Sequence, residues 1–309
     1  MNLFRSRFLL ALVLCARAGP FAGADPADGK AAEKPEADGP GYIRFLARGQ
    51  DAGRLETAVV TFEKKDVRVH LVAAVHVADR AYYEELNRTF EKYDAVLYEM
   101  VKPREVEPDD PGKSQSLISI FQRGLKDTLG LEFQLEVIDY SRKNFIHADL
   151  DSETFQKLQE ERGENLFTLM MRALLDDLRR KSQGKAAEDL NGFDLLKVFL
   201  SRDRSRSLKL LLARQFKDIE GRLAGMEGER GSVILTERNK AAFEVLKKTI
   251  GQGKKEIGIF YGGAHLPDLE RRLKEELGFE RKDTRWLLAW DMPERSEGGS
   301  RKSEVGKEK

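Results

Sequence analysis

The 309-residue sequence has little cysteine, little histidine and almost no net charge, and these shortages limit what the protein can do. Its single cysteine, Cys15, has no partner for an intrachain disulfide and lies inside a predicted export signal that is removed. Disulfides and cysteine nucleophiles are therefore excluded from the mature chain. A formal net charge of +1 gives no general attraction for nucleic acid or an acidic membrane, so we expect no nucleic-acid partner.

Long apolar runs and several familiar catalytic motifs are also missing. The N-terminal run FLLALVLCA has nine residues, whereas a membrane-spanning helix needs about 20, so we predict no stable membrane span. The sequence contains no G-x-S-x-G elbow, no H-E-x-x-H motif, no phosphate-binding G-x-x-x-x-G-K-S/T loop and no G-x-G-x-x-G fingerprint. The chemistries that these motifs carry are therefore not indicated.

The first 24 residues are typical of a secretory signal peptide. MNLFRSR is basic, FLLALVLCA is apolar, and the small-x-small sites Ala16–Ala18 and Ala22–Ala24 follow. A signal peptide over 1–24 predicts an exported protein, either periplasmic or secreted. Two alternatives stay open, a buried N-terminal helix and a lipoprotein anchored at Cys15. Leu14 disfavours the lipoprotein, because a small residue is expected before a lipidated cysteine.

The composition divides the chain into a structured body and two polar ends. Residues 25–40 and 293–309 are small and charged, and we predict a disordered linker and a disordered charged tail. The body over 41–292 is near the size of one α/β domain. Between about 114 and 230 the apolar spacing is mainly helical, which predicts a large helical insertion. Within it, NFIHADLD does not distinguish a strand from a loop.

Apolar runs on both sides of this insertion predict an α/β fold with a mixed central sheet. GYIRFLARG and LETAVVTFEKK flank a glycine-bearing turn, which predicts an antiparallel hairpin. Residues 66–100 have a strand–helix–strand pattern with a short crossover, which favours parallel pairing. Towards the C-terminus, a strand, a helix and a final strand are predicted over KEIGIFYGG, LPDLERRLKEEL and TRWLLAWDM.

Three residues of metal-binding types stand where predicted strands end. His76, Glu99 and His265 each lie at the carboxyl end of a strand, where α/β sheets form their sites. If these strands are parallel neighbours, two imidazoles and a carboxylate meet, which is a common ligand set for a catalytic divalent ion of unspecified identity. Gly262 and Gly263 would permit positive φ and close backbone approach ahead of His265. A half-buried histidine without a ligand is the alternative at each position.

The other two histidines give weaker indications of a site. His70 shares an alternating face with apolar residues inside its strand, and we predict that it is a residue of the sheet. His147 precedes a predicted helix cap, and a place for it in the lining of the site is left open.

Four segments, taken in order, resemble the TraB/PrgY/GumN family: AAVHVADRAYYEEL, DAVLYEM, TERN and YGGAHLPDL. That family includes the Tiki Wnt-cleaving metalloproteases and is similar in structure to erythromycin-esterase-like and ChaN-like proteins. Its second G-x-x-H motif matches Gly262 to His265, and its strand-end glutamate matches Glu99. The first motif departs from the family, because Ala73 stands in the place of glycine ahead of His76.

The resemblance extends to the family's Arg-Asn pair, matched by Arg238 and Asn239. It implies a metal-dependent hydrolase, or more narrowly a peptidase, whose divalent ion is held by the two matched histidines and Glu99. Glu99 would act as the third ligand or as a general base, and Arg238 would polarise a carbonyl or hold a substrate carboxylate. Asn239, Gly262 and Gly263 would contact the substrate.

Over about 41–292 the resemblance implies a peptide or small-molecule substrate without naming one. One alternative is a non-catalytic protein of the export compartment that binds a ligand, a haem or a metal. Another is a metal-free esterase that uses histidine and glutamate as acid and base. Metal content, and the effect of a chelator on turnover, distinguish the three.

Overall fold

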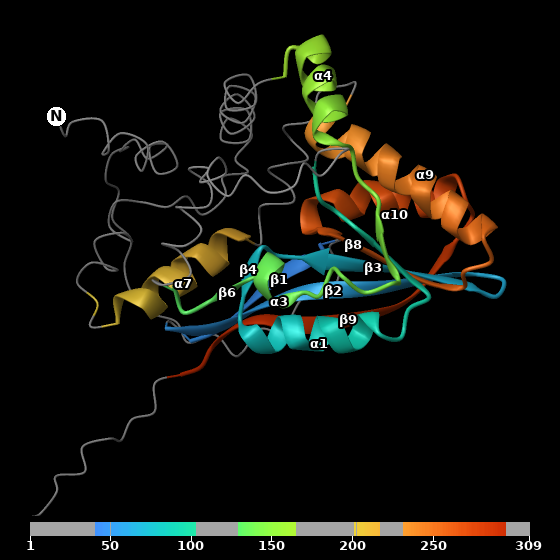
Figure 1. Ribbon diagram of the computed structural model, residues 1–309. Helices are drawn as coiled ribbons and strands as arrows, with labels where there is room; N and C mark the ends of the chain where they lie inside the picture. The colour runs from blue at the N-terminus through green and yellow to red at the C-terminus, as the bar shows by residue number, and fades with distance from the viewer. Residues whose placement is uncertain are drawn as a thin grey trace, which may run out of the picture.

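The computed structural model describes residues 41–49, 51–102, 129–164, 201, 203–216 and 231–294, which form a mixed α/β fold (Figure 1). The fold has a seven-stranded, partly parallel sheet with helices packed against it. The described ranges contain six α-helices. The predicted fold class is confirmed. The predicted signal peptide, the linker, and much of the insertion and of the tail lie outside the described residues. Within those same ranges, no helix is long and apolar enough to cross a membrane.

The main sheet consists of β1 (Ile43–Arg48), β2 (Ala52–Lys64), β3 (Val67–Ala74), β5 (Ala95–Tyr98), β7 (Phe145–His147), β8 (Glu256–Gly262) and β9 (Glu280–Met292). β2 pairs antiparallel with β9 on one side and with β1 and β3 on the other, so the predicted hairpin of β1 and β2 is confirmed. From β3 the sheet continues through β8, β5 and β7, and these four strands are parallel.

β8 separates the two strands of the predicted strand–helix–strand unit. β3, α1 (Arg80–Phe90) and β5 follow one another along the chain, and β3 and β5 are parallel as expected. However, β8 lies between them and pairs with both. The chain leaving β8 therefore emerges beside the chain leaving β5, where the amide of Glu99 donates to the carbonyl of Phe260 at 3.2 Å.

The predicted insertion contributes strands as well as helices. β7 lies in the ambiguous segment NFIHADLD and pairs with β5, so this segment belongs to the main sheet. β6 (Glu132–Phe133) pairs with β4 (Val77–Ala78) and leads into the short helix α3 (Gln134–Val137). Two further helices of the insertion are described, α4 (Ser152–Arg162) and α7 (Arg204–Phe216).

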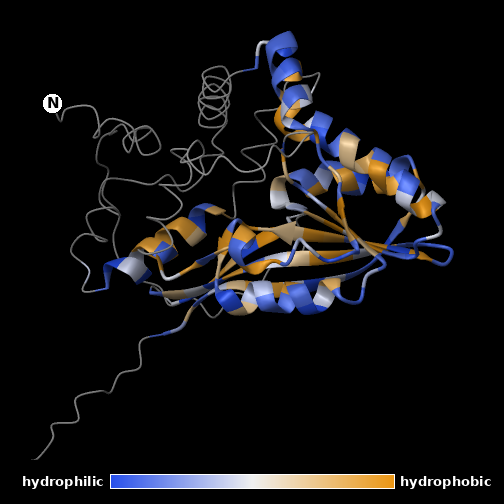
Figure 2. Cartoon of the chain, in the orientation of Figure 1, coloured by the Kyte–Doolittle hydropathy of each residue, from blue (hydrophilic) through white to orange (hydrophobic). Residues whose placement is uncertain are grey.

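Helices cover both faces of the sheet, because its central strands are apolar on both sides. On one face, α1 and α7 contribute to a core that includes Val72 and Phe260. On the other, α9 (Arg238–Gly251) and α10 (Leu266–Glu275) pack over a core that includes Leu71. Figure 1 shows α1 on one side of the strands and α9 and α10 on the other, and Figure 2 shows hydrophobic residues along the strands between them.

His70 is a buried residue of the sheet, as predicted. Its Nε2 lies 2.6 Å from Glu256 Oε1 and its Nδ1 lies 3.0 Å from Thr61 Oγ1. An ionised carboxylate can only accept, so Nε2 donates to Glu256 and Nδ1 accepts from the Thr61 hydroxyl. The ring also stacks on Tyr93, with the centroids 4.6 Å apart. Burial lowers the pKa of His70 below its ordinary value, although Glu256 opposes this effect.

The lowered pKa of His70 predicts a loss of stability in mild acid. The unfolded chain takes up a proton near the ordinary histidine pKa of about 6.5, whereas the folded chain does so only at lower pH. The free energy of unfolding should therefore fall as the pH is lowered from 7 to 5. His70→Gln removes the titrating group, so its urea unfolding should depend less on pH over this range. An equal pH dependence in both proteins would contradict this interpretation.

Candidate functional site

Polar side chains gather where three parallel strands end. Glu99 directly follows β5, Asp149 comes two residues after β7, and His265 ends the 3₁₀ turn η2 (Gly263–His265) that follows β8. Arg238, the first residue of α9, reaches the same place. Because adjacent parallel strands have their carboxyl ends at one edge of the sheet, residues distant in sequence meet there.

Glu99 accepts hydrogen bonds at both carboxylate oxygens. Oε1 accepts from Arg238 Nη2 at 2.7 Å, and Oε2 accepts from the Gly262 amide at 2.7 Å. Burial by itself would raise the pKa of this carboxyl. A protonated His265, Arg238 and the Gly262 amide outweigh burial and hold the pKa well below its usual range. With a neutral His265, Arg238 and the Gly262 amide still stabilise the carboxylate. Glu99 is therefore an ionised carboxylate.

Asp149 and Arg238 form a buried, two-pronged ion pair. Arg238 Nε donates to Oδ1 at 2.9 Å and Nη2 donates to Oδ2 at 2.6 Å. The Asp149 side chain is fully buried, and that of Arg238 is 11% exposed. Burial alone would lower the pKa of Arg238, but Asp149 and Glu99 raise it above its ordinary value. The guanidinium is thus a fixed positive charge held between two carboxylates.

Asn239 fixes the protonation pattern of His265. Its Nδ2 donates to the carbonyl of His265 at 3.1 Å and to Asp268 Oδ2 at 3.0 Å. Two acceptors on Nδ2 identify the amide nitrogen, so the atom 2.7 Å from His265 Nδ1 is the amide oxygen Oδ1. His265 Nδ1 therefore carries a proton and donates it to Asn239. In the neutral ring, Nε2 is then the unprotonated nitrogen.

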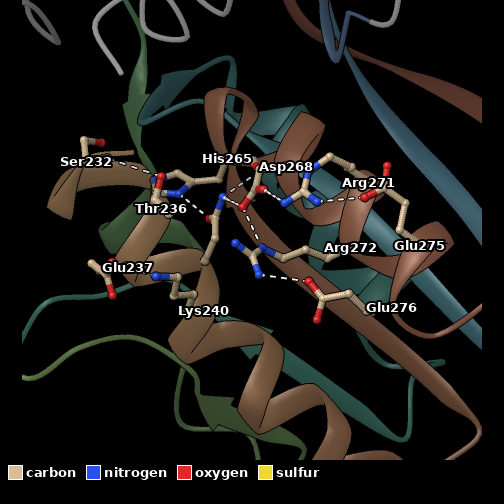
Figure 3. A network of polar contacts seen from close by, with 11 residues as sticks. Ser232, Thr236, Glu237, Lys240, His265, Asp268, Arg271, Arg272, Glu275 and Glu276 are labelled. Carbon is tan, nitrogen blue, oxygen red and sulfur yellow. Dashed lines mark hydrogen bonds and ion pairs between the residues drawn. The ribbon is translucent and has the colours of Figure 1, made fainter. Parts of the chain in front are cut away.

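Asp268 anchors this arrangement from α10. Arg271 Nη2 donates to Oδ1 at 2.7 Å, and Arg272 Nε donates to Oδ2 at 2.8 Å (Figure 3). Burial would raise the pKa of Asp268, but the two arginines and Asn239 lower it. Asp268 is therefore ionised and can accept only. It holds the Asn239 amide in the single orientation that presents Oδ1 to His265.

The pair formed by His265 and Glu99 has the donor chemistry of a cation site. His265 Nε2 lies 3.6 Å from Glu99 Oε1, and the two side chains are 5% and 15% exposed. Two ligands at 2.1 Å from a tetrahedral ion are about 3.4 Å apart. Glu99 and Asp149 carry two negative charges against the single positive charge of Arg238. A divalent ion or a proton on Nε2 would supply the positive charge that the buried cluster lacks.

His76 is not gathered with this pair. Its side chain is exposed, and its carbonyl accepts from the backbone amide of Gln134 at 3.0 Å. Among the described residues, no group of three or more His, Cys, Asp or Glu side chains is placed to hold a metal ion. Of the three predicted ligands, the structure brings Glu99 and His265 together. His76 follows β3, on the opposite side of β8 from Glu99.

The predicted positive φ at Gly262 and Gly263 is wrong. Gly262 has φ −53° and ψ 140°, and Gly263 is not among the glycines with positive φ. The predicted close approach does hold at Gly262, because a Cβ there would lie 3.3 Å from Glu99 Oε2. A side chain at position 262 would therefore press on the carboxylate, which would have to shift by a few tenths of an ångström. His147 lies outside the hydrogen-bonded cluster just described and bonds through Nε2 to the carbonyl of Met100 at 2.6 Å.

The sequence analysis singled out neither Asp268 nor Asp149. Asp149 is the one that stands at a strand end. A strand assignment for NFIHADLD would have pointed to Asp149, because this residue then stands at the carboxyl end of a parallel strand. The ambiguous strand assignment of NFIHADLD concealed it. Asn239, predicted to contact substrate, instead binds His265 and Asp268 within the protein.

Removing Asp149 should destabilise the fold strongly. Asp149→Ala leaves the buried Arg238 with one carboxylate in place of two, and breaking a buried pair costs about 3 kcal/mol. The matched control is Asp291→Ala, whose partner Arg54 lies 3.6 Å away at the exposed surface. The control should change the free energy of unfolding by less than about 0.5 kcal/mol. Urea unfolding of the two variants checks the difference, and equal effects would refute a central role for Asp149.

Filling the space at Gly262 should displace the carboxylate of Glu99. Its backbone angles suit alanine, so Gly262→Ala acts through the added methyl and should cost about 1 kcal/mol. Gly251→Ala is the control, since nothing lies within 4 Å of its added Cβ and it ends helix α9. That change should be neutral or stabilise by about 0.5 kcal/mol. Thermal unfolding measures both, and a neutral Gly262→Ala would show that Glu99 is not confined there.

Comparisons with known proteins leave the family of this chain undetermined. No family model matches it, and no curated protein and no solved structure does so either. The resemblance of its motifs therefore stays a prediction, and the geometry of the site is the basis for assigning a function.

Proposed function

We propose that the chain is an exported metal-dependent hydrolase, with peptides among its candidate substrates. The observation that carries the proposal is the facing pair of His265 Nε2 and Glu99 Oε1, 3.6 Å apart in a nearly buried site. An imidazole nitrogen and an ionised carboxylate oxygen at this separation are a donor pair for a divalent cation. The TraB/PrgY/GumN-like motifs and the predicted signal peptide support the same proposal.

In this proposal His265 and Glu99 hold the ion. The resemblance implies His76 as a third ligand, but His76 is exposed and lies apart from the pair in this structure. A bound divalent ion would supply a Lewis acid that activates water and polarises the bond to be cleaved. Asn239 keeps the proton of His265 on Nδ1, which leaves Nε2 available as a ligand. His76 lies at the same edge of the sheet, because β3 runs parallel to β8 and ends beside it.

Glu99 is better suited to hold a cation than to act as a general base. Both of its oxygens already accept hydrogen bonds, from Arg238 and from the Gly262 amide. A carboxylate stabilised in this way is a weak base, and weak bases remove protons from water poorly at neutral pH. Of the two roles left open by the sequence, we therefore assign to Glu99 the role of ligand.

Arg238 has a positioning role and a candidate substrate contact. Its Nε and Nη2 are engaged with Asp149 and Glu99, so the guanidinium holds the Glu99 carboxylate in place. Nη1 takes part in none of these three bonds. We assign to Nη1 the polarisation of a substrate carbonyl, or the binding of a substrate carboxylate, as in other preorganised sites.

Metal analysis with matched variants tests the proposal. The exported chain is loaded with zinc, manganese or cobalt, desalted and assayed for metal content, and should retain about one ion per chain. His265→Ala and Glu99→Gln should lose the ion, and His76→Ala should weaken its retention. His70→Ala is the control that keeps it, because His70 is bonded within the sheet. Circular dichroism verifies that each variant is folded.

Turnover on a mixed panel of peptides and esters, with and without a chelator, separates the alternatives. The proposed hydrolase loses turnover on chelation and recovers it when metal is added. Turnover that survives chelation would favour acid–base catalysis by His265 and Glu99 alone. Full metal retention without turnover would favour the non-catalytic binding protein. A folded His265→Ala variant that keeps its full metal content would refute the site itself.

A further inference from the structure

β9 is the outermost strand on one side of the sheet and is open to solvent. It pairs with β2 alone, whereas β2 pairs on its other side with β1 and β3. Exposed side chains occur over residues 280–283 and at Arg285 and Leu288. Leu288 is 37% exposed, which is unusual for a large apolar side chain in a strand. A partner can therefore approach β9 from outside the molecule.

The hydrogen bonds of β2 identify which of its backbone groups face β9. The amide of Ala58 donates to the carbonyl of Tyr42 at 2.8 Å, and these two residues lie opposite each other when the register of β1 and β2 is extended by one position. In an antiparallel pair, residues alternate between bonding to the partner strand and bonding away from it. The even-numbered residues of β2 therefore bond towards β1, and the odd-numbered residues bond towards β9.

Three residues of β9 direct their backbone groups to the free edge. Arg285 and Leu287 lie opposite odd-numbered residues of β2 and therefore bond to that strand. Thr284, Trp286 and Leu288 alternate with them, so their N–H and C=O groups point away from β2. Among the residues that the structure describes, no hydrogen bond from outside the β2–β9 pair reaches these three backbone positions. We call residues 284–288 the open edge.

The two ends of the open edge differ. At its C-terminal end, the amide of Asp79 donates to the carbonyl of Ala289 at 2.9 Å, and Asp79 Oδ2 accepts from the amide of Asp291 at 2.6 Å. These contacts block further pairing. At its N-terminal end, residues 280–283 are charged, and charges on an edge strand normally prevent pairing with other chains. This run has both signs of charge, so it accepts a strand with complementary charges and opposes others.

We infer that the open edge pairs with the same edge of a second copy of the chain, in a two-fold symmetric antiparallel dimer. Residues that face each other across such a pair have side chains on the same side of the sheet, so the axis passes through the position of one residue. An axis at any of residues 280–283, or at Arg285, would place like charges directly opposite each other, which is destabilising. An axis at Trp286 would place Asp283 against Ala289, whose carbonyl already accepts from Asp79.

An axis at Thr284 gives complementary pairs. It places Asp283 of each copy opposite Arg285 of the other, at a position where antiparallel side chains approach closely. Asp283 is exposed, and within the described ranges no ion pair involves it. Arg285 is 45% exposed although it contacts α1, so it remains accessible to a second carboxylate. The same axis places Lys282 opposite Trp286, which sets a cation beside an indole ring.

The proposed dimer joins two sheets into one and leaves the candidate site free. β2 and β3 lie between β9 and β8, so the open edge is on the other side of the sheet from Glu99 and His265. The inference therefore does not rest on the proposed hydrolase function.

Sedimentation velocity of the full chain tests the dimer. The concentration should run from about 5 to 500 µM, because a short edge buries a small interface of modest affinity. A reversible monomer–dimer equilibrium is expected. Leu288→Lys adds a charge beside the open edge, and Thr284→Pro removes an outward N–H that β2 does not use, so each should weaken dimerisation about tenfold or more. Leu135→Lys is the matched control, since Leu135 is 66% exposed on α3, and it should dimerise like the parent chain.

A charge exchange tests both the identity of the partner and the axis. Asp283→Lys alone opposes lysine to Arg285 in its own dimer, and Arg285→Glu alone opposes glutamate to Asp283, so each should remain a monomer. When the two variants are mixed, both contacts become complementary, and a heterodimer should form. Circular dichroism verifies that each variant is folded. A mixture that remains monomeric, under conditions in which the parent chain dimerises, would overturn the proposed pairing.

Hydrogen exchange of the unmodified chain, followed by NMR, provides a test without substitutions. The amides of Thr284, Trp286 and Leu288 should exchange rapidly at low concentration and become protected as the dimer forms. Those of Arg285 and Leu287 should be protected at every concentration, because they bond to β2. A chain that stays monomeric over the whole range, or a dimer that Leu288→Lys and Thr284→Pro leave unchanged, would refute the inference.

Discussion

The guanidinium of Arg238 is the interaction on which the arrangement of the site depends. It bonds to Asp149 with two nitrogens and to Glu99 with one of them, and so ties the first turn of α9 to the ends of β7 and β5. All three side chains are at least largely buried, and three charges in such a place are tolerated only when they are closely paired. The pairing fixes the position of the Glu99 carboxylate that faces His265.

Irregular backbone delivers the remaining residues to the same point. A π-helical turn, η1 (Val233–Glu237), immediately precedes α9, and a 3₁₀ turn carries the chain from β8 into α10. π-Helical turns are rare and frequently occur at functional sites. Here the two turns bring the starts of α9 and α10 together. The neighbouring residues Arg238 and Asn239 can then serve different partners, Glu99 in one case and His265 in the other.

A second layer of charges supports the imidazole. The chain of contacts runs from Arg271 and Arg272 through Asp268 and Asn239 to His265. An ionised carboxylate only accepts, so Asp268 binds the amide nitrogen of Asn239. The amide oxygen is then the atom that faces His265 Nδ1. The result is a ring whose Nδ1 is identified as a proton donor by its hydrogen-bond partner. Supporting contacts of this type orient the ligands in many metal sites.

The sequence by itself determined the fold class and most of the elements. Alternating and helical apolar patterns identified the β1–β2 hairpin, the unit of β3, α1 and β5, and the final strand, because such patterns depend on local geometry. It also placed Glu99 and His265 at strand ends. Tertiary structure decided which strands are neighbours. β8 lies between β3 and β5 in the sheet. This strand order brings Glu99, after β5, beside His265, after β8. It leaves His76, after β3, on the other side of β8. Strand order depends on contacts between residues more than 150 positions apart, which local periodicity does not encode. For the same reason, only the folded chain could reveal Asp149 as a partner of Arg238 and Asn239 as a partner of His265.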